Sequence, residues 1–159
     1  MRLHGARLRL PDVPVHHPGI IEPAGGPNEI WKFGDRAYAV IEKLIRLRER
    51  LRPYIHRQME ITSQTGMPIM RPMFYGFPDD EKCYELDDQY LFGSDILFAP
   101  IMERGQTSRK VYLPKDRWVL TMNGNVYEGG QTVTVHAELE QFIAFVPEGS
   151  PILPIFGKD

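Results

Sequence analysis

The stretch that decides the fold runs from Met67 to Met102 and reads MPIMRPMFYGFPDDEKCYELDDQYLFGSDILFAPIM. A long helical pattern precedes it, and a series of short strand patterns follows it. Within it, Ile69–Tyr75 is apolar apart from Arg71 and is bounded by Pro68 and Gly76. These features predict a short buried strand.

Two further elements are expected in the second half of this stretch. Asp87 and Asp88 stand where a helix N-cap belongs, so they predict a short helix over Gln89–Phe92 that ends at Gly93. The apolar run Ile96–Ile101 has the length of one buried strand. An apolar strand beside a long helix favours a parallel sheet, because crossover helices cover both faces of such a sheet.

Upstream of this stretch, Asp35–Thr65 is predicted to be helical. Asp35 is a good N-cap, and Gly66 is a C-terminal stop. Pro53 removes one backbone donor inside the pattern, so a kink or two abutting helices are expected there. The apolar residues that recur at steps of three and four are Ala37, Ile41, Leu44, Leu51, Ile55 and Met59.

Residues 1–34 are rich in proline and glycine, which argues against regular structure. An irregular segment of this length is either functional or disordered. Trp31 and Phe33 near its end favour an ordered loop, because two aromatic rings gain from burial.

Beyond Met102 the apolar pattern changes to a period of two, which is typical of strands. Asn123-Gly124-Asn125 is a hairpin signal. The strands expected here are Val111–Leu113, Arg117–Met122, Val126-Tyr127, Thr132–Ala137, Phe142–Val146 and Ile152–Phe156. Short strands with turns at this spacing predict an antiparallel sandwich, of which Ile96–Ile101 is the first strand.

An ordered set of segments resembles the C-terminal part of glycoside hydrolase family 31, which contains α-glucosidases and α-xylosidases. The segments are RPMFYGFPDD, YELDDQYLFGSDILFAPIM, VYLP, VYEGGQTVTV and FVPEGSPI. The resemblance implies an α+β chain in which the last helix and strand of a (β/α)8 TIM barrel lead into a small antiparallel β-sandwich. It divides the chain into residues 1–94, the end of the barrel domain, and residues 95–159, the proximal sandwich domain.

Composition and charge exclude several classes of function. A net charge of −2 gives no electrostatic case for nucleic acid or for an anionic membrane. The arginines Arg46, Arg48, Arg50 and Arg52 lie at steps of two, so on a helix they form local ion pairs or a solvated face rather than one stripe. The sequence has no apolar run long enough to span a membrane, which requires about 18 residues or more.

The single cysteine, Cys83, excludes a disulfide framework and is expected to be a buried, inert thiol. The first residues lack the apolar run of a signal peptide, so a cytoplasmic location is expected. His16 and His17 have no third ligand at metal spacing, and we expect no metal and no cofactor.

The resemblance supplies one substrate-binding candidate. Arg2-Leu3-His4-Gly5 is similar to the family's Arg-x-His segment, whose histidine binds hydroxyls of the sugar beside the cleaved bond. His4 matches that histidine, and Arg2 would be its neighbour. The alternative is that both side chains are solvated at the start of the chain. Trp31 and Phe33 are further candidates for a sugar subsite, or they pack as staples ahead of the long helix.

The acidic pairs Asp79-Asp80 and Asp87-Asp88 invite a two-carboxylate glycosidase interpretation. Adjacent residues point apart, so neither pair can flank one glycosidic bond, and both pairs are expected to be loop and cap acids. His56 and His136 are expected to be structural.

The sequence also departs from the family in one decisive respect. A retaining glycosidase needs two carboxylates about 5–5.5 Å apart. The family supplies them from a Trp-x-Asp-Met-Asn-Glu-like strand end and from a segment closing in Trp-x-Gly-Asp. Neither motif occurs in this sequence. We therefore expect a fragment that is inactive alone, whose catalytic residues would lie upstream.

The expected parent is a retaining, exo-acting α-glycosidase whose partners are α-linked glucosides or xylosides. Exposed barrel-facing surface would favour self-association of the isolated chain. The alternative is a non-catalytic carbohydrate-binding or scaffolding module. Such modules present exposed aromatic platforms, whereas Tyr112, Trp118, Tyr127 and Phe145 lie inside strand patterns and are expected in the core.

Overall fold

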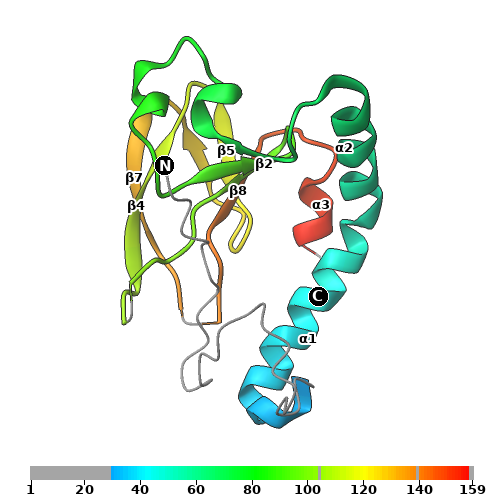
Figure 1. Ribbon diagram of the computed structural model, residues 1–159. Coiled ribbons are helices and arrows are strands. Elements are labelled where there is room, and N and C mark those ends of the chain that lie inside the picture. Colours follow the sequence, from blue (N-terminus) through cyan, green and yellow to red (C-terminus); the bar gives the residue numbers. More distant parts are fainter. Residues whose placement is uncertain (1–29, 104, 139, 158–159) are drawn as a thin grey trace, which may run out of the picture.

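The structure, a computed structural model, describes residues 30–103, 105–138 and 140–157. The elements form three layers (Figure 1): a helical layer, a six-stranded sheet and a two-stranded sheet. The long helices run along one side of the molecule, and the two sheets stand opposite them. No described helix is long and apolar enough to cross a membrane.

The helical layer begins with a short 3-10 helix, η1 (Ile30–Phe33), and continues with α1 (Asp35–Arg50) and α2 (Arg52–Thr65). The predicted break is confirmed, because Leu51 separates the two helices and Pro53 lies in the first turn of α2. Gly66 ends α2 in the left-handed conformation at φ 73°, as expected. Asp35 is the first helical residue, and Gly34 rather than Asp35 is the N-cap.

Six short strands form the larger sheet in the order β1-β2-β3-β8-β5-β6. They are β1 (Met70–Pro72), β2 (Tyr90–Phe92), β3 (Ile96–Phe98), β5 (Arg117–Leu120), β6 (Val126–Glu128) and β8 (Ala144–Pro147). The smaller sheet pairs β4 (Ser108–Leu113) with β7 (Gln131–His136). The expected hairpin joins β5 to β6 across Gly124, which has a φ of 75°.

The prediction of a parallel sheet is wrong, because every pairing among the described strands is antiparallel. The strand predicted over Ile69–Tyr75 is also shorter, since Pro72 ends β1 and the 3-10 helix η2 (Met73–Tyr75) follows. Gly93, with a φ of 67°, turns the chain from β2 directly into β3. The connection is therefore a tight antiparallel turn rather than a crossover.

The short helix predicted over Gln89–Phe92 is wrong as well, because Tyr90–Phe92 forms β2. The reason is a contact distant in sequence. The buried Gln89 side-chain amide donates to the Tyr112 carbonyl at 2.7 Å and accepts from the Tyr112 N–H at 2.9 Å. This pairing ties the chain to β4 in an extended conformation.

The strand predicted over Ile152–Phe156 is a helical turn, α3 (Leu153–Phe156). Pro154 lies in its first turn, where the missing N–H has no helical partner to lose. The same proline in a strand would have removed a ladder hydrogen bond. α3 lies against α1 in the helical layer.

The central strands β3 and β8 of the larger sheet are buried on both faces, and alternation along the strands separates two cores. Leu91, Leu97 and Phe145 face the smaller sheet, where they join Trp118 and residues of β4 and β7. Their neighbours Ile96, Ala144 and Val146 face the helices and pack with Leu51 and Tyr54. The predicted sandwich is thus confirmed, with a helical layer added to its outer face.

The expected domain boundary between residues 94 and 95 falls between β2 and β3, which pair with each other. One sheet therefore runs across it. The division of the chain at that point, and the assignment of α1, α2 and β1 to a barrel, stay predictions about a longer protein.

Candidate functional site

The substrate-binding candidates His4 and Arg2 lie outside the described residues, as do His16 and His17. Trp31 and Phe33 lie in η1, directly before α1. Trp31 is 64% exposed, so its ring is not a buried staple, whereas Phe33 is half-buried. A sugar-binding role for either ring stays a prediction.

One acid of each acidic pair has structural contacts, as expected of loop and cap acids. Asp80 caps the 3-10 helix η3 (Glu81–Tyr84) by accepting from the Lys82 N–H, and it accepts from the Tyr112 hydroxyl at 2.7 Å. Asp88 lies 2.6 Å from the buried guanidinium of Arg109, which also donates to the Pro100 carbonyl at 2.6 Å. These acids anchor loops to the sandwich and do not form a glycosidase pair.

Cys83 is fully buried, and burial together with Asp80 raises the pKa of its thiol to about 11. The thiol is therefore protonated near neutral pH and is a poor nucleophile, as predicted. Among the described residues, no group of three or more His, Cys, Asp or Glu side chains could hold a metal ion.

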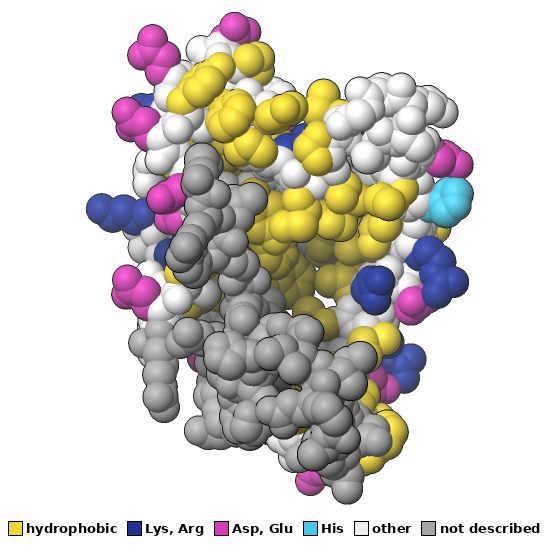
Figure 2. All heavy atoms as spheres, viewed as in Figure 1, with side chains coloured by type: hydrophobic (Ala, Val, Ile, Leu, Met, Phe, Trp, Pro, Cys, Tyr) yellow, Lys and Arg dark blue, Asp and Glu magenta, His cyan; other side chains and the backbone are white. Residues whose placement is uncertain are grey.

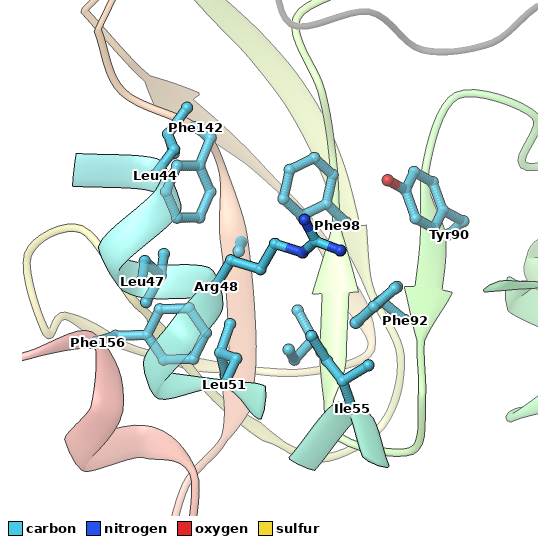
Figure 3. A pocket seen from close by; sticks show the side chains of 12 residues that line it. Leu44, Leu47, Arg48, Leu51, Ile55, Tyr90, Phe92, Phe98, Phe142 and Phe156 are labelled. Atoms are coloured by element: carbon cyan, nitrogen blue, oxygen red, sulfur yellow. The ribbon is translucent and has the colours of Figure 1, made fainter. Parts of the chain in front are cut away.

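An apolar groove of about 250 Å³ lies between the helices and the outer face of the larger sheet (Figure 2). Its lining residues are Leu44, Leu47, Arg48, Leu51, Ile55, Tyr90, Phe92, Ile96, Phe98, Phe142, Ala144 and Phe156. Figure 3 shows the Arg48 side chain extending from α1 towards Phe98. Burial raises the pKa of Tyr90 and so keeps its hydroxyl protonated. No carboxylate is among these lining residues, so the groove can hold apolar surface but not hydrolyse a glycoside.

A polar network holds α2 beside this groove. The Tyr54 hydroxyl donates to the Phe92 carbonyl at 2.8 Å and accepts from the Asp95 N–H at 3.1 Å. Gln58 donates to Ser94 at 3.0 Å, and the Asp95 carboxylate accepts from the Ser150 hydroxyl at 3.0 Å. The network therefore joins α2, the turn between β2 and β3, and the loop before α3.

An aromatic surface that the sequence analysis missed lies on η2 and η3. The rings of Phe74 and Tyr84 are stacked, with centroids 5.1 Å apart and planes 11° apart. Tyr75 lies against Phe74 at 5.5 Å, and both tyrosines are about half exposed. The available signal was the cluster of aromatic residues around the FPDD turn, which lies outside any strand pattern.

These observations define an antiparallel β-sandwich domain that carries a helical layer on one face. Residues 66–152 match the family model described as "Glycosyl hydrolase family 31 C-terminal domain". The chain belongs to glycoside hydrolase family 31.

The curated relatives of this chain are much longer proteins. It is 42% identical over 125 residues to Alpha-glucosidase 2 of Bacillus thermoamyloliquefaciens, covering 79% of this chain and 16% of that protein. It is 39% identical over 134 residues to an Alpha-xylosidase of Saccharolobus solfataricus, covering 84% of this chain and 18% of that protein. The chain thus spans less than a fifth of both relatives.

The fold is shared with a crystal structure of a GH31 alpha-xylosidase from a soil metagenome complexed with xylose. The two are 43% identical and superpose with a TM-score of 0.81 over 83% of this chain and 20% of the other. The family model matches residues 66–152, which do not include α1 or α2. The superposition covers 83% of this chain, which is more than residues 66–159 supply, so the structural likeness extends upstream of residue 66.

Proposed function

We propose that this chain is the C-terminal part of a retaining, exo-acting α-glycosidase that hydrolyses α-linked glucosides or xylosides. The observation that carries the proposal is the sequence similarity of this chain to an α-glucosidase and to an α-xylosidase. The two alignments cover 79% and 84% of the chain. Both relatives act, by their names, on α-linked sugars. The ordered family segments of the sequence support the same substrate class.

In this role the chain supports the catalytic part and does not perform the chemistry. Double displacement needs a nucleophile and an acid/base carboxylate about 5–5.5 Å apart. The family's two aspartate motifs do not occur in the sequence, and the acidic pairs that do occur hold loops. The isolated chain is therefore inactive in this proposal.

The apolar groove fits the same role, because it is a surface that a neighbouring part of the enzyme can cover. In the isolated chain it also favours self-association. Sedimentation velocity would detect such association, and Leu47→Lys inside the groove would reduce it. Ile45→Lys is the matched control, because Ile45 is exposed on the same helix and is not among the lining residues.

His4 is the substrate-binding residue in this proposal, with Arg2 beside it. Removing a side chain that hydrogen-bonds a sugar hydroxyl leaves that hydroxyl unpaired, at about 1–3 kcal/mol. In a complete enzyme that carries this chain, His4→Ala should lower kcat/KM by about tenfold to a hundredfold. Steady-state hydrolysis of nitrophenyl α-glucoside and α-xyloside measures the effect.

His56→Ala is the control for that experiment. His56 is exposed on α2 and lies 3.4 Å from Glu60, so its loss should leave turnover unchanged. Unaltered kinetics from His4→Ala in a correctly folded enzyme would remove His4 from the site.

A second candidate function is non-catalytic carbohydrate binding, and the exposed aromatic surface on η2 and η3 favours it. The strand aromatics do not, because Trp118, Phe145 and Tyr112 are buried as predicted and Tyr127 is half-buried. Reporter-glycoside hydrolysis by the complete enzyme separates the two functions from each other. Turnover supports the glycosidase, whereas glycan affinity without turnover supports the module.

A further inference from the structure

We propose that Tyr84, backed by Phe74, is a surface site that binds an α-linked glucose oligosaccharide. The substrate class rests on the proposed function, whereas the site itself rests on the geometry of η2 and η3. Figure 2 shows apolar side chains gathered on the surface over these two elements. The site is separate from the apolar groove, whose lining includes neither residue.

The Tyr84 ring is held in place by two contacts. One face stacks on Phe74 at 5.1 Å, and the hydroxyl donates to the Pro78 carbonyl at 3.0 Å. The residue is nevertheless 58% exposed, so its side chain is accessible to a ligand. A flat ring fixed in this way loses little conformational freedom on binding, which favours a ligand that lies on it.

The chemistry around the ring suits a sugar. A pyranose ring presents C–H groups to an aromatic face and directs its hydroxyls outward. Glu81 and Tyr84 are three residues apart in a 3-10 helix, where side chains at that spacing are aligned, so we expect the Glu81 carboxylate on the same side of η3 as the ring. A carboxylate accepts hydrogen bonds from hydroxyl groups.

The charge around the site excludes an anionic ligand. Asp79, Glu81 and Glu85 are all exposed near the ring in sequence. The one cation of η3, Lys82, lies 5.1 Å from the centroid of the Tyr112 ring instead. A phosphate-bearing ligand would meet this acidic rim and be repelled, whereas a neutral oligosaccharide would not.

The extent of the surface favours an oligosaccharide over a monosaccharide. Tyr75 adjoins Phe74 at 5.5 Å and is 49% exposed. The apolar surface therefore continues beyond the area of one sugar ring. A second sugar ring of an oligosaccharide can therefore contact this neighbouring surface.

The test is a titration of the isotope-labelled chain with maltotriose, followed by amide NMR shifts. We expect saturable shifts in residues 73–85 at about millimolar sugar, the range of a small and shallow site. Tyr84→Ala should weaken binding by at least about tenfold, a loss of about 1.4 kcal/mol. Tyr84→Phe keeps the ring face and should bind within about threefold of the original chain.

Controls keep the result independent of folding and of the proposed activity. Tyr38→Ala removes an exposed aromatic ring of α1 and should leave binding unchanged. Glu81→Gln keeps the ring and should weaken binding several-fold. Absence of saturable shifts in the original chain, or binding that Tyr84→Ala leaves intact, would overturn the site. Absence of glycosidase activity in the complete enzyme would contradict the proposed function but not this site, because the titration measures binding and not turnover.

Discussion

Gly93 shows how closely α2 approaches the turn between β2 and β3. Its φ is 67°, and an added Cβ would lie 2.1 Å from the Tyr54 hydroxyl oxygen. Gly93→Ala therefore combines a left-handed backbone for an L-residue with a steric clash against the anchoring tyrosine. We expect a loss of about 2–5 kcal/mol in the free energy of unfolding, measured by urea denaturation.

Gly124→Ala is the matched control. Its φ is 75°, and nothing lies within 4 Å of an added Cβ. Only the cost of the left-handed backbone conformation, about 1–2 kcal/mol in the free energy of unfolding, applies there. Equal losses at the two glycines would show that the contact between Gly93 and Tyr54 does not constrain the turn.

Because of Cys83, we expect the free energy of unfolding to depend on pH in the alkaline range. Burial and Asp80 raise the pKa of its thiol from 9.0 to about 11. Between these values the unfolded chain releases a proton that the folded chain keeps, so the free energy of unfolding falls as pH rises. The slope is up to about 1.4 kcal/mol per pH unit.

Cys83→Ala should flatten this decline between about pH 9 and about pH 10, because it removes the titrating group. Above about pH 10 the tyrosines add a similar decline, since burial raises the pKa of Tyr112 to about 12. Urea unfolding at each pH measures both chains. An unchanged slope in Cys83→Ala would assign the decline to other groups.

Residues whose role is local could be predicted from the sequence, and those whose role depends on distant partners could not. Pro53 breaks the helix and Gly66 ends it through backbone chemistry alone. Gln89 is different, because its amide pairs with Tyr112, 23 positions away, and this pairing converts a predicted helix into a strand. Arg109 is likewise buried only because the Asp88 and Pro100 loops enclose it.

At the scale of elements, the helical layer is expected to be the less protected part of the chain. Among the side chains of α1, only Ala37 and Val40 are buried, whereas Tyr38 and Ile45 are exposed. Strand β8 is buried on both faces. Hydrogen exchange should therefore be faster in α1 than in β8. Equal protection of α1 and β8 in a monomeric chain would contradict this account.

Tyr54→Phe tests how α2 is attached to the larger sheet. The change leaves the Asp95 N–H and the Phe92 carbonyl without their hydroxyl partner, at about 1–3 kcal/mol. Exchange should rise in α2, whereas the β4–β7 pair in the other sheet should be unaffected. Faster exchange in β4 and β7 as well would mean that the layers unfold together.

Some of the elements predicted from the sequence are correct and others are wrong. The period-two pattern after Met102 predicted strands such as β7, because the inward side chains of Val133 and Val135 alternate with exposed neighbours along it. Ile152–Phe156 has a similar apolar composition but folds as α3, where Pro154 suits a first helical turn. The aromatic surface on η2 and η3 carries no periodic pattern, so sequence periodicity could not reveal it.

At the scale of the whole molecule, the three layers fit the supporting role that we propose for the chain. The sandwich supplies a buried core, and the helices leave an apolar groove that a larger protein can cover. The resemblance of ordered segments predicted a C-terminal piece of a family 31 protein, and the family match confirms the membership. The position of His4 lies outside the described residues, so its role depends on the complete enzyme.

The central claim is that this chain supports a glycosidase without performing hydrolysis itself. The most direct measurement is steady-state hydrolysis of nitrophenyl α-glucoside and α-xyloside by the purified chain, with a complete family 31 α-glycosidase as the positive control. We expect a rate equal to that of buffer, because the sequence contains neither catalytic aspartate motif. Saturable turnover by the purified chain, retained through further purification, would contradict the claim.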